Sequence, residues 1–228
     1  KRQLDRPIDY LVKRCTALFL TASIAARSSL IEVLQLSDHK VAVLVNTFDM
    51  KPVTISSQMM RQKLRIPEGY LVIGSVGELS TRKGHAIFIE AILKLVSSGE
   101  QRVRVLIIGD GPEKSELKQM IARHRLEEFI SLIPFSDNIS NYYNVFDLYI
   151  HTSIEFDDLP FAVREAMSMG LPTIASNIGG IPELICDDHN GLLFESGDAQ
   201  DLSAKIAELI KDVQRRERIG KQNLEEYK

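Results

Sequence analysis

The feature that most constrains the fold is a regular alternation of short apolar runs and amphipathic segments from Leu71 to Ile210. Runs with β-type composition lie at Leu71–Val76, Val103–Ile108, Ile130–Ile133, Leu148–Ile150 and Thr173–Ala175. Segments with helical spacing lie at His85–Val96, Lys114–His124, Ile139–Val145, Phe161–Met169 and Ala199–Ile210. Strands that alternate with helices predict an α/β fold with a doubly wound, Rossmann-like parallel sheet, covered by helices on both faces.

The first 69 residues have a different pattern. The spacing predicts helices at Ile8–Cys15 and Ile24–Leu34 and strands at Ala17–Thr21 and Lys40–Val45. Residues 50–69 are polar, contain Pro52 and Pro67, and are typical of a linker with one helix at Ser56–Leu64. The polar tail Lys211–Lys228 is expected to be helical.

Composition excludes several classes of protein. A net charge of −3 argues against a nucleic-acid platform, which needs a clustered basic face. Cys15 and Cys186 are far apart and fit neither a disulfide scaffold nor a zinc site, so a reducing compartment is expected. The longest apolar stretch, Cys15–Ala26, is shorter than the roughly 20 residues of a membrane span. We expect a cytoplasmic protein, with a peripheral contact at the inner face of a membrane left open.

Ligands of open parallel sheets bind beyond the carboxyl ends of the strands. The first such loop, Gly77–Gly84, offers glycines for close backbone approach and two adjacent cations, Arg82 and Lys83, for an anion. Two exposed surface cations are the alternative. The loop Gly109–Pro112 also follows a strand, but Gly-x-Gly there is explained by a tight turn without any ligand.

The stretch from His151 to Glu183 is the second candidate for chemistry. A strand ends in a polar loop that carries Ser153, Glu155, Asp157 and Asp158, and Leu159-Pro160 then opens a helix. Glu165 lies one turn into this helix among small and apolar neighbours. Its carboxylate is either withdrawn from water, being half-buried against a partner or aimed into a cleft, or it is solvated at a favourable helix start.

Asp157, seven residues, Glu165-Ala166-Met167, Gly170-Leu171-Pro172 and Gly179-Gly180-Ile181-Pro182-Glu183 together resemble a known signature. It is similar to the Glu-x7-Glu pattern of the family 4 retaining glycosyltransferases, which have the GT-B fold. The resemblance runs from about Tyr70 to the end of the chain. It implies a carboxy-terminal domain that binds a nucleotide-diphospho-sugar.

The resemblance also implies roles for single residues. Lys83 would hold the donor diphosphate and stabilise the charge on the leaving group. Arg82 would partly replace a family arginine, since that position is Glu78 here. Asp157 would bind a sugar hydroxyl, with Glu155 as a rival, and Glu165 would bind the ribose hydroxyls. Further donor contacts are implied for Gly77, Phe135, Asp158, Leu159, Pro160 and Phe161.

By the same resemblance, residues 1–49 are the remnant of an amino-terminal, acceptor-side domain, 50–69 the linker and 70–228 the donor-binding domain. The full protein would transfer a sugar with retention to a saccharide or lipid-linked acceptor, in polysaccharide or glycoconjugate biosynthesis. Neither a metal nor a cofactor is expected, and this chain alone is expected to be inactive. Two alternatives stay open: a non-catalytic nucleotide-sugar-binding module, suggested by Glu78 and Asp157, and a GT-B nucleotide-sugar isomerase.

Overall fold

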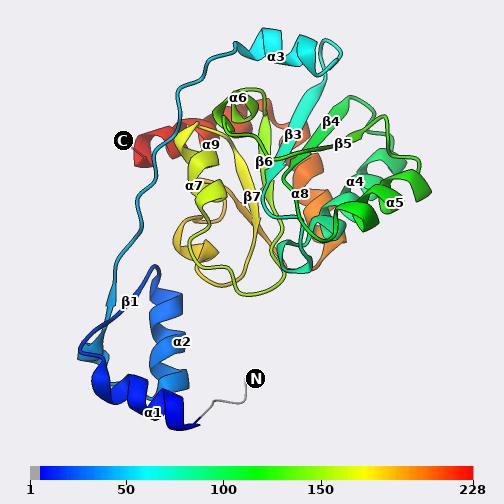
Figure 1. The fold of residues 1–228 in the computed structure, drawn as a ribbon. Helices are drawn as coiled ribbons and strands as arrows, with labels where there is room; N and C mark the ends of the chain where they lie inside the picture. The colour runs from blue at the N-terminus through cyan, green and yellow to red at the C-terminus, as the bar shows by residue number, and fades with distance from the viewer. Residues whose placement is uncertain (1–5, 228) are drawn as a thin grey trace.

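A computed structural model of the chain describes residues 6–227, with side chains described from Leu11 onward. Its main body is a six-stranded sheet in the order β5-β4-β3-β6-β7-β8 (Figure 1). All neighbouring strands pair in parallel. The strands are β3 (Leu71–Val76), β4 (Val103–Ile108), β5 (Ile130–Ile133), β6 (Leu148–His151), β7 (Thr173–Ser176) and β8 (Leu192–Phe194). The predicted doubly wound sheet is confirmed.

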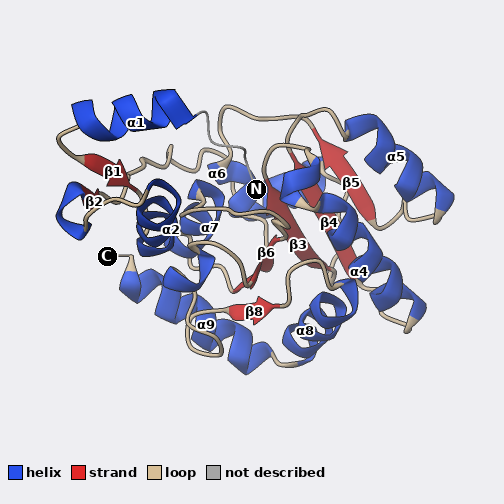
Figure 2. Cartoon of the chain, turned by 90° about the horizontal axis from the view of Figure 1, so that it is seen from below, coloured by secondary structure: helices blue, strands red, loops and turns tan. Residues whose placement is uncertain are grey.

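Helices cover both faces of the sheet and bury two apolar clusters against it (Figure 2). One cluster joins the sheet to α4 (His85–Ser97), α5 (Lys114–Arg123) and α8 (Ala199–Lys211). The other joins it to α6 (Ser140–Tyr143) and α7 (Phe161–Ser168). The central strands are nearly continuous apolar runs because both of their faces are buried.

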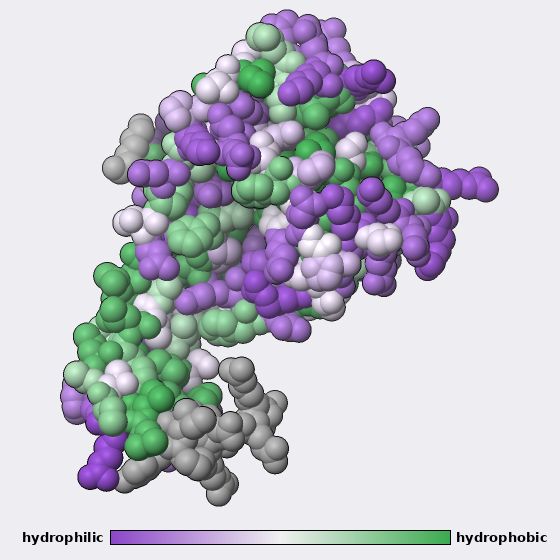
Figure 3. All heavy atoms as spheres, in the orientation of Figure 1, coloured by the Kyte–Doolittle hydropathy of each residue, from purple (hydrophilic) through white to green (hydrophobic). Residues whose placement is uncertain are grey.

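The amino-terminal unit is small and lies to one side of the main body (Figure 1). It contains α1 (Arg6–Cys15), β1 (Phe19–Thr21), α2 (Ile24–Leu34), the 3₁₀ turn η1 (Asp38–Lys40) and β2 (Val41–Val43). Strands β1 and β2 pair in parallel and form a sheet of their own. Several of its large apolar side chains are exposed, and Figure 3 shows apolar surface gathered there: Leu18, Leu20, Ile24, Leu44 and Val45.

The connection between the two parts runs from residue 44 to α3 (Ser57–Lys63) and is held by α7 and by the last helix, α9 (Val213–Glu226). Arg164 of α7 is only 9% exposed, and within residues 6–227 it forms no ion pair. It donates to the Asn46 carbonyl at 2.5 Å and to the Tyr227 hydroxyl at 3.2 Å. Its guanidinium carbon also lies 5.0 Å from the centre of the Phe48 ring.

The amino-terminal unit also contacts the main body through one carboxylate. Glu183 ends the 3₁₀ turn η3 (Ile181–Glu183) and accepts hydrogen bonds from the first two backbone amides of α2. The distances are 2.8 Å to the Ile24 nitrogen and 2.6 Å to the Ala25 nitrogen. Ser23 caps the same helix end by accepting from Ala26. An anionic group at a helix amino terminus is a favourable arrangement.

Three local predictions were wrong. Strand β8 was not predicted, and it forms by pairing with β7. A helix is also expected after the Gly-Gly turn of the signature, and the structure has only the single 3₁₀ turn η3 there. The helix predicted at Ile139–Val145 is the shorter α6, and Asn138 just before it donates to the Pro52 carbonyl.

Within residues 6–227, none of the helices has the length and apolar character needed to span a lipid bilayer. Residues 1–5 and Lys228, which belong to the predicted amino-terminal domain and tail, lie outside the described residues.

Candidate functional site

Two loops at the carboxyl edge of the sheet are locked together by backbone contacts around Gly84. Gly84 has a left-handed φ of 64°, and a Cβ atom there would lie 2.1 Å from the Thr152 carbonyl oxygen. The Thr152 hydroxyl donates to the Lys83 carbonyl at 2.9 Å, and the Ile154 amide donates to the Arg82 carbonyl at 3.0 Å. Only glycine fits this turn, which places the two cations of the β3–α4 loop beside the loop that follows β6.

Asp157 lies at the centre of this contact. Its Oδ2 atom accepts from Lys83 Nζ at 2.5 Å, Ser153 Oγ at 2.6 Å and His151 Nε2 at 2.9 Å. Its Oδ1 atom lies 3.4 Å from Arg82 Nη1. The Lys83 and Asp157 side chains are only 14% and 10% exposed, so the ion pair is largely withdrawn from water. Three of the predicted site residues therefore converge.

The charge states of this cluster follow from its contacts. Burial lowers the pKa of His151, although its hydrogen bond to Asp157 opposes that effect, so the ring is neutral at pH 7. Because a carboxylate only accepts, Nε2 carries the His151 hydrogen. Burial alone raises the pKa of Asp157, but its contacts with His151, Lys83 and Ser153 outweigh burial and hold the pKa well below the ordinary value.

The Asp157 backbone is fixed from the opposite side by the Gly-Gly turn. Gly179 has φ of 61°, and a Cβ atom there would lie 2.0 Å from the Asp157 carbonyl oxygen. The Gly180 amide donates to that same oxygen at 2.9 Å. The two glycines in this part of the signature are thus explained by close backbone packing against the acidic loop.

Glu165 is half-buried, as one of the two sequence interpretations requires. The Tyr143 hydroxyl lies 2.9 Å from Glu165 Oε2, and this is the one hydrogen bond to the carboxylate among the described residues. Burial raises the pKa of Glu165, and the Tyr143 hydrogen bond opposes the rise. The carboxylate therefore has capacity for further donors.

Strand β6 links the surroundings of the two carboxylates. His151 of β6 donates to Asp157. Tyr149, two residues earlier on β6, has its ring centre 5.8 Å from that of Tyr143, whose hydroxyl donates to Glu165. Burial, and then the charges of Glu165 and Asp157, raise the pKa of Tyr149 well above its ordinary value. Lys83, Asp157 and Glu165 thus belong to one connected group of side chains, at the edge of the sheet where ligands of such folds bind.

The other predicted residues surround this group. Phe135 is 68% exposed after β5, and its amide donates to Asp110 Oδ2 at 3.0 Å. Phe161 opens α7, with its ring 6.3 Å from that of Phe48. Glu78 is exposed and accepts from the Ser80 hydroxyl at 3.1 Å.

The remaining predicted positions also lie in these loops. Gly77 follows β3, and a Cβ atom there would meet only His85 Nε2, at 3.8 Å. Asp158 has a buried Oδ1 atom without a hydrogen-bond partner among the described residues. Leu159 is half-buried, and buried Pro160 is the amino-terminal cap of α7. Glu155 is exposed and, among the described residues, forms no hydrogen bond or ion pair with Lys83 or Asp157.

Sequence reasoning missed His151 and Ser153 as parts of the site. His151 was interpreted as a strand-end residue, and it does end β6. Both side chains are buried, and their contacts exist only because Asp157 folds back over the strand end. A buried histidine followed by a serine and an aspartate on one short loop was the available signal.

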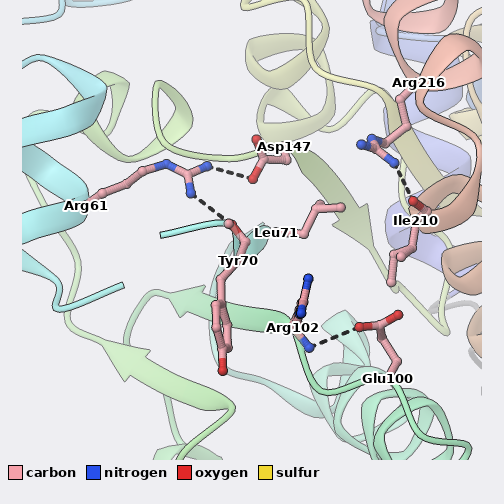
Figure 4. A pocket seen from close by; sticks show the side chains of 9 residues that line it. Arg61, Tyr70, Leu71, Glu100, Arg102, Asp147, Ile210 and Arg216 are labelled. Atoms are coloured by element: carbon pink, nitrogen blue, oxygen red, sulfur yellow. Dashed lines mark hydrogen bonds and ion pairs between the residues drawn. The ribbon is translucent and has the colours of Figure 1, made fainter. Parts of the chain in front are cut away.

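A second polar group lies at the amino edge of the sheet and has a structural explanation. Figure 4 shows a pocket where Arg61 donates to Asp147 at 2.7 Å and to the Tyr70 carbonyl at 2.9 Å. Asp147 Oδ2 also accepts from the Val72 amide at 2.7 Å. Arg216 donates to the carbonyl groups at the end of α8. The contacts of Arg61 and Asp147 join α3 to β3 and to the loop before β6, and those of Arg216 join α9 to α8. The residues that line this pocket do not include Lys83 or Asp157.

Comparisons with known proteins bear on the family and the fold of the chain. The model of the family described as glycosyl transferases group 1 matches residues 56–226. The sulfoquinovosyl transferase SQD2 of Arabidopsis thaliana is 35% identical over 175 residues, covering 75% of this chain and 32% of that protein. The amylovoran biosynthesis glycosyltransferase AmsK of Erwinia amylovora is 36% identical over 146 residues, covering 61% and 36%. The chain spans about a third of the length of these relatives.

Solved structures agree as well. Anabaena HepE in complex with UDP and glucose superposes with a TM-score of 0.88 at 27% identity, covering 97% of this chain and 61% of HepE. HepE is also known in complex with UDP-glucose, with the same TM-score.

Proposed function

The chain belongs to the group 1 glycosyl transferases and has their GT-B type of fold, and on this basis we propose that it binds the nucleotide-diphospho-sugar donor of a retaining sugar transfer. The observation that carries the proposal is the contact of Lys83 with Asp157 at the carboxyl edge of the sheet, with Glu165 linked to that edge through Tyr143 and Tyr149. Relatives that make amylovoran and colanic acid favour a role in polysaccharide biosynthesis.

Each side chain then has one task. Glu165 accepts the ribose hydroxyls, since its carboxylate has spare acceptor capacity. Lys83, with Arg82, holds the diphosphate and stabilises the charge that grows on it as the sugar leaves. Asp157 accepts a sugar hydroxyl. Backbone around Asp158 to Phe161 meets the diphosphate at the start of α7.

The acceptor is assigned to the amino-terminal side of the cleft. We propose that residues 1–49 are the end of an acceptor-side domain and that residues 50–69 are the linker. The exposed apolar side chains of β1 and β2 support this assignment, because such strands are normally covered by further structure. The transfer reaction then belongs to the full-length protein, on the cytoplasmic side of the membrane when the acceptor is lipid-linked.

Substitution of Glu165 tests the donor site. Glu165→Gln should weaken UDP binding roughly tenfold or more, because a hydrogen bond to a charged group contributes about 1.5–3 kcal/mol. The wild-type chain should bind UDP that lacks the ribose 2′- and 3′-hydroxyls more weakly than UDP, by a similar factor. The Glu165→Gln chain should bind this analogue and UDP with nearly the same affinity. ADP and GDP are measured alongside by calorimetry.

Glu155→Gln is the matched control, because it removes an exposed carboxylate from the adjacent loop. Equal affinity of the wild-type and Glu165→Gln chains for every nucleotide would remove Glu165 from the site. A melting temperature close to that of the wild-type chain ensures that the change reports on binding.

A non-catalytic binding module is the second candidate, favoured by the negative charge of Glu78 on the diphosphate loop. The substitution Glu78→Arg in the full-length protein distinguishes the two functions. A binding module gains nucleotide affinity without any sugar transfer, whereas a transferase transfers sugar with glutamate or arginine at this position.

A further inference from the structure

The cations assigned to the diphosphate are not free in this structure. Among the described residues, the side chain of Lys83 is bound by Asp157 alone, at 2.5 Å from Nζ, and Arg82 contacts the other oxygen of the same carboxylate. A diphosphate with two or three negative charges therefore meets two cations that already have an anion between them. Glu78, on the same loop, adds no positive charge.

Asp157 is also held independently of these cations. Ser153 and His151 both donate to Oδ2, at 2.6 and 2.9 Å, and both are buried. If Lys83 moves to another anion, these two hydrogen bonds keep the carboxylate in place. Oδ2 then has capacity for another donor, and Oδ1 has only the 3.4 Å contact with Arg82 among the described residues, so the carboxylate can accept from a neutral group such as a sugar hydroxyl.

We propose that Asp157 is an internal competitor for the diphosphate and that a donor binds by exchange: the diphosphate takes Lys83 from Asp157, and the released carboxylate accepts a hydroxyl of the sugar. This inference rests on the proposed function and deepens it. When a nucleotide sugar binds, a hydrogen bond from a sugar hydroxyl replaces the ion pair that Asp157 has lost. A free nucleoside diphosphate has no sugar to donate such a bond. The same residue therefore disfavours the nucleoside diphosphate that remains after transfer, and its return to Lys83 promotes product release.

The test measures UDP and UDP-glucose binding to this chain by calorimetry, with ADP, GDP and their glucose conjugates as further probes. Asp157→Asn should bind the free diphosphate about tenfold more tightly, the factor expected when the competent state of the wild-type site is populated about one part in ten. The same substitution should remove the preference for the nucleotide sugar over the diphosphate. Exchange predicts both effects from one substitution: tighter binding of the free diphosphate, and loss of the higher affinity for the nucleotide sugar.

Two controls isolate the mechanism. In a Lys83→Gln background, Asp157→Asn should strengthen diphosphate binding much less, because only the 3.4 Å contact of Asp157 with Arg82 is left to release. Glu155→Gln removes one negative charge from the same loop without contacting Lys83 and should leave the affinity nearly unchanged. An equal gain in either control, or no gain from Asp157→Asn in the wild-type background, would overturn the proposal.

A crystal structure of the wild-type chain with UDP gives an answer that does not depend on the variant folding. The proposal requires Lys83 Nζ to lie on the diphosphate and beyond 4 Å from Asp157, with Ser153 and His151 still bound to the carboxylate. An intact Lys83–Asp157 pair beside the bound diphosphate would refute exchange while leaving the donor site established. A wild-type chain that binds none of the nucleotides would refute both proposals.

Discussion

His85 should make the folded chain sensitive to mild acid. It is the first residue of α4, is 2% exposed, and lies behind the loop that carries Lys83. Its Nε2 atom lies 3.2 Å from the Glu78 carbonyl oxygen, so Nε2 carries the hydrogen, while Nδ1 is buried without a partner among the described residues. Protonation would place a charge on a buried ring that has no carboxylate to meet it.

The magnitude follows from the pKa. Burial, together with the nearby His151 and Lys83, lowers the pKa of His85 from 6.5 to about 4. Between these values the unfolded chain binds more protons than the folded chain, so stability falls as the pH falls through this window and levels off below it. A complete shift corresponds to about 3 kcal/mol, and roughly 2 kcal/mol of it should be lost between pH 7 and pH 5.

The assay is urea unfolding of the wild-type chain and His85→Gln at pH 7, 6 and 5. Glutamine keeps a donor near the Glu78 carbonyl but does not titrate. The difference between the two unfolding free energies should change by roughly 2 kcal/mol over this range. His151 adds a slope in the same direction, because burial lowers its pKa too, but it is present in both chains. Parallel loss of stability by the two chains would refute the reasoning.

Two further substitutions probe the turns around Asp157. Gly179→Ala should destabilise the chain by more than about 1 kcal/mol and weaken UDP binding, because the added Cβ would collide with the Asp157 carbonyl. The control in thermal unfolding is Gly197→Ala, since Gly197 also has a positive φ but no atom lies within 4 Å of the position of its Cβ. Similar losses from both would contradict this packing argument. Glu183→Gln should speed hydrogen exchange of the first α2 amides roughly 2- to 5-fold, since it removes the anion at that helix end. Unchanged exchange would mean that the contact contributes nothing.

Most of the sheet could be predicted from the sequence because its strands are buried on both faces. Leu71–Val76 and Val103–Ile108 are mostly apolar runs between polar turns, and the structure reproduces both ranges. Strand β8 could not be found in the same way. Leu192-Leu193-Phe194 is preceded by the single 3₁₀ turn η3 and not by a helical segment, so the strand–helix alternation does not indicate it. It becomes a strand by pairing with β7.

The convergence of the candidate site was predictable in part. Lys83 and Asp157 follow strands whose carboxyl ends meet at one edge, and topology alone brings them close. That they would contact each other was not predictable, because the contact depends on Gly84 packing against Thr152. The support from His151 and Ser153 was hidden for a related reason, since a buried strand-end histidine has the same sequence context as a core residue.

Arg164 joins parts of the chain that are far apart in sequence. It is the neighbour of Glu165 on α7, and it holds both the Asn46 carbonyl, just after the amino-terminal unit, and the hydroxyl of Tyr227 beyond the last helix. One guanidinium therefore joins α7, the segment that leaves the amino-terminal unit and the end of the chain. Loss of this side chain would release three segments from one another beside Glu165, the carboxylate that we propose accepts the ribose hydroxyls.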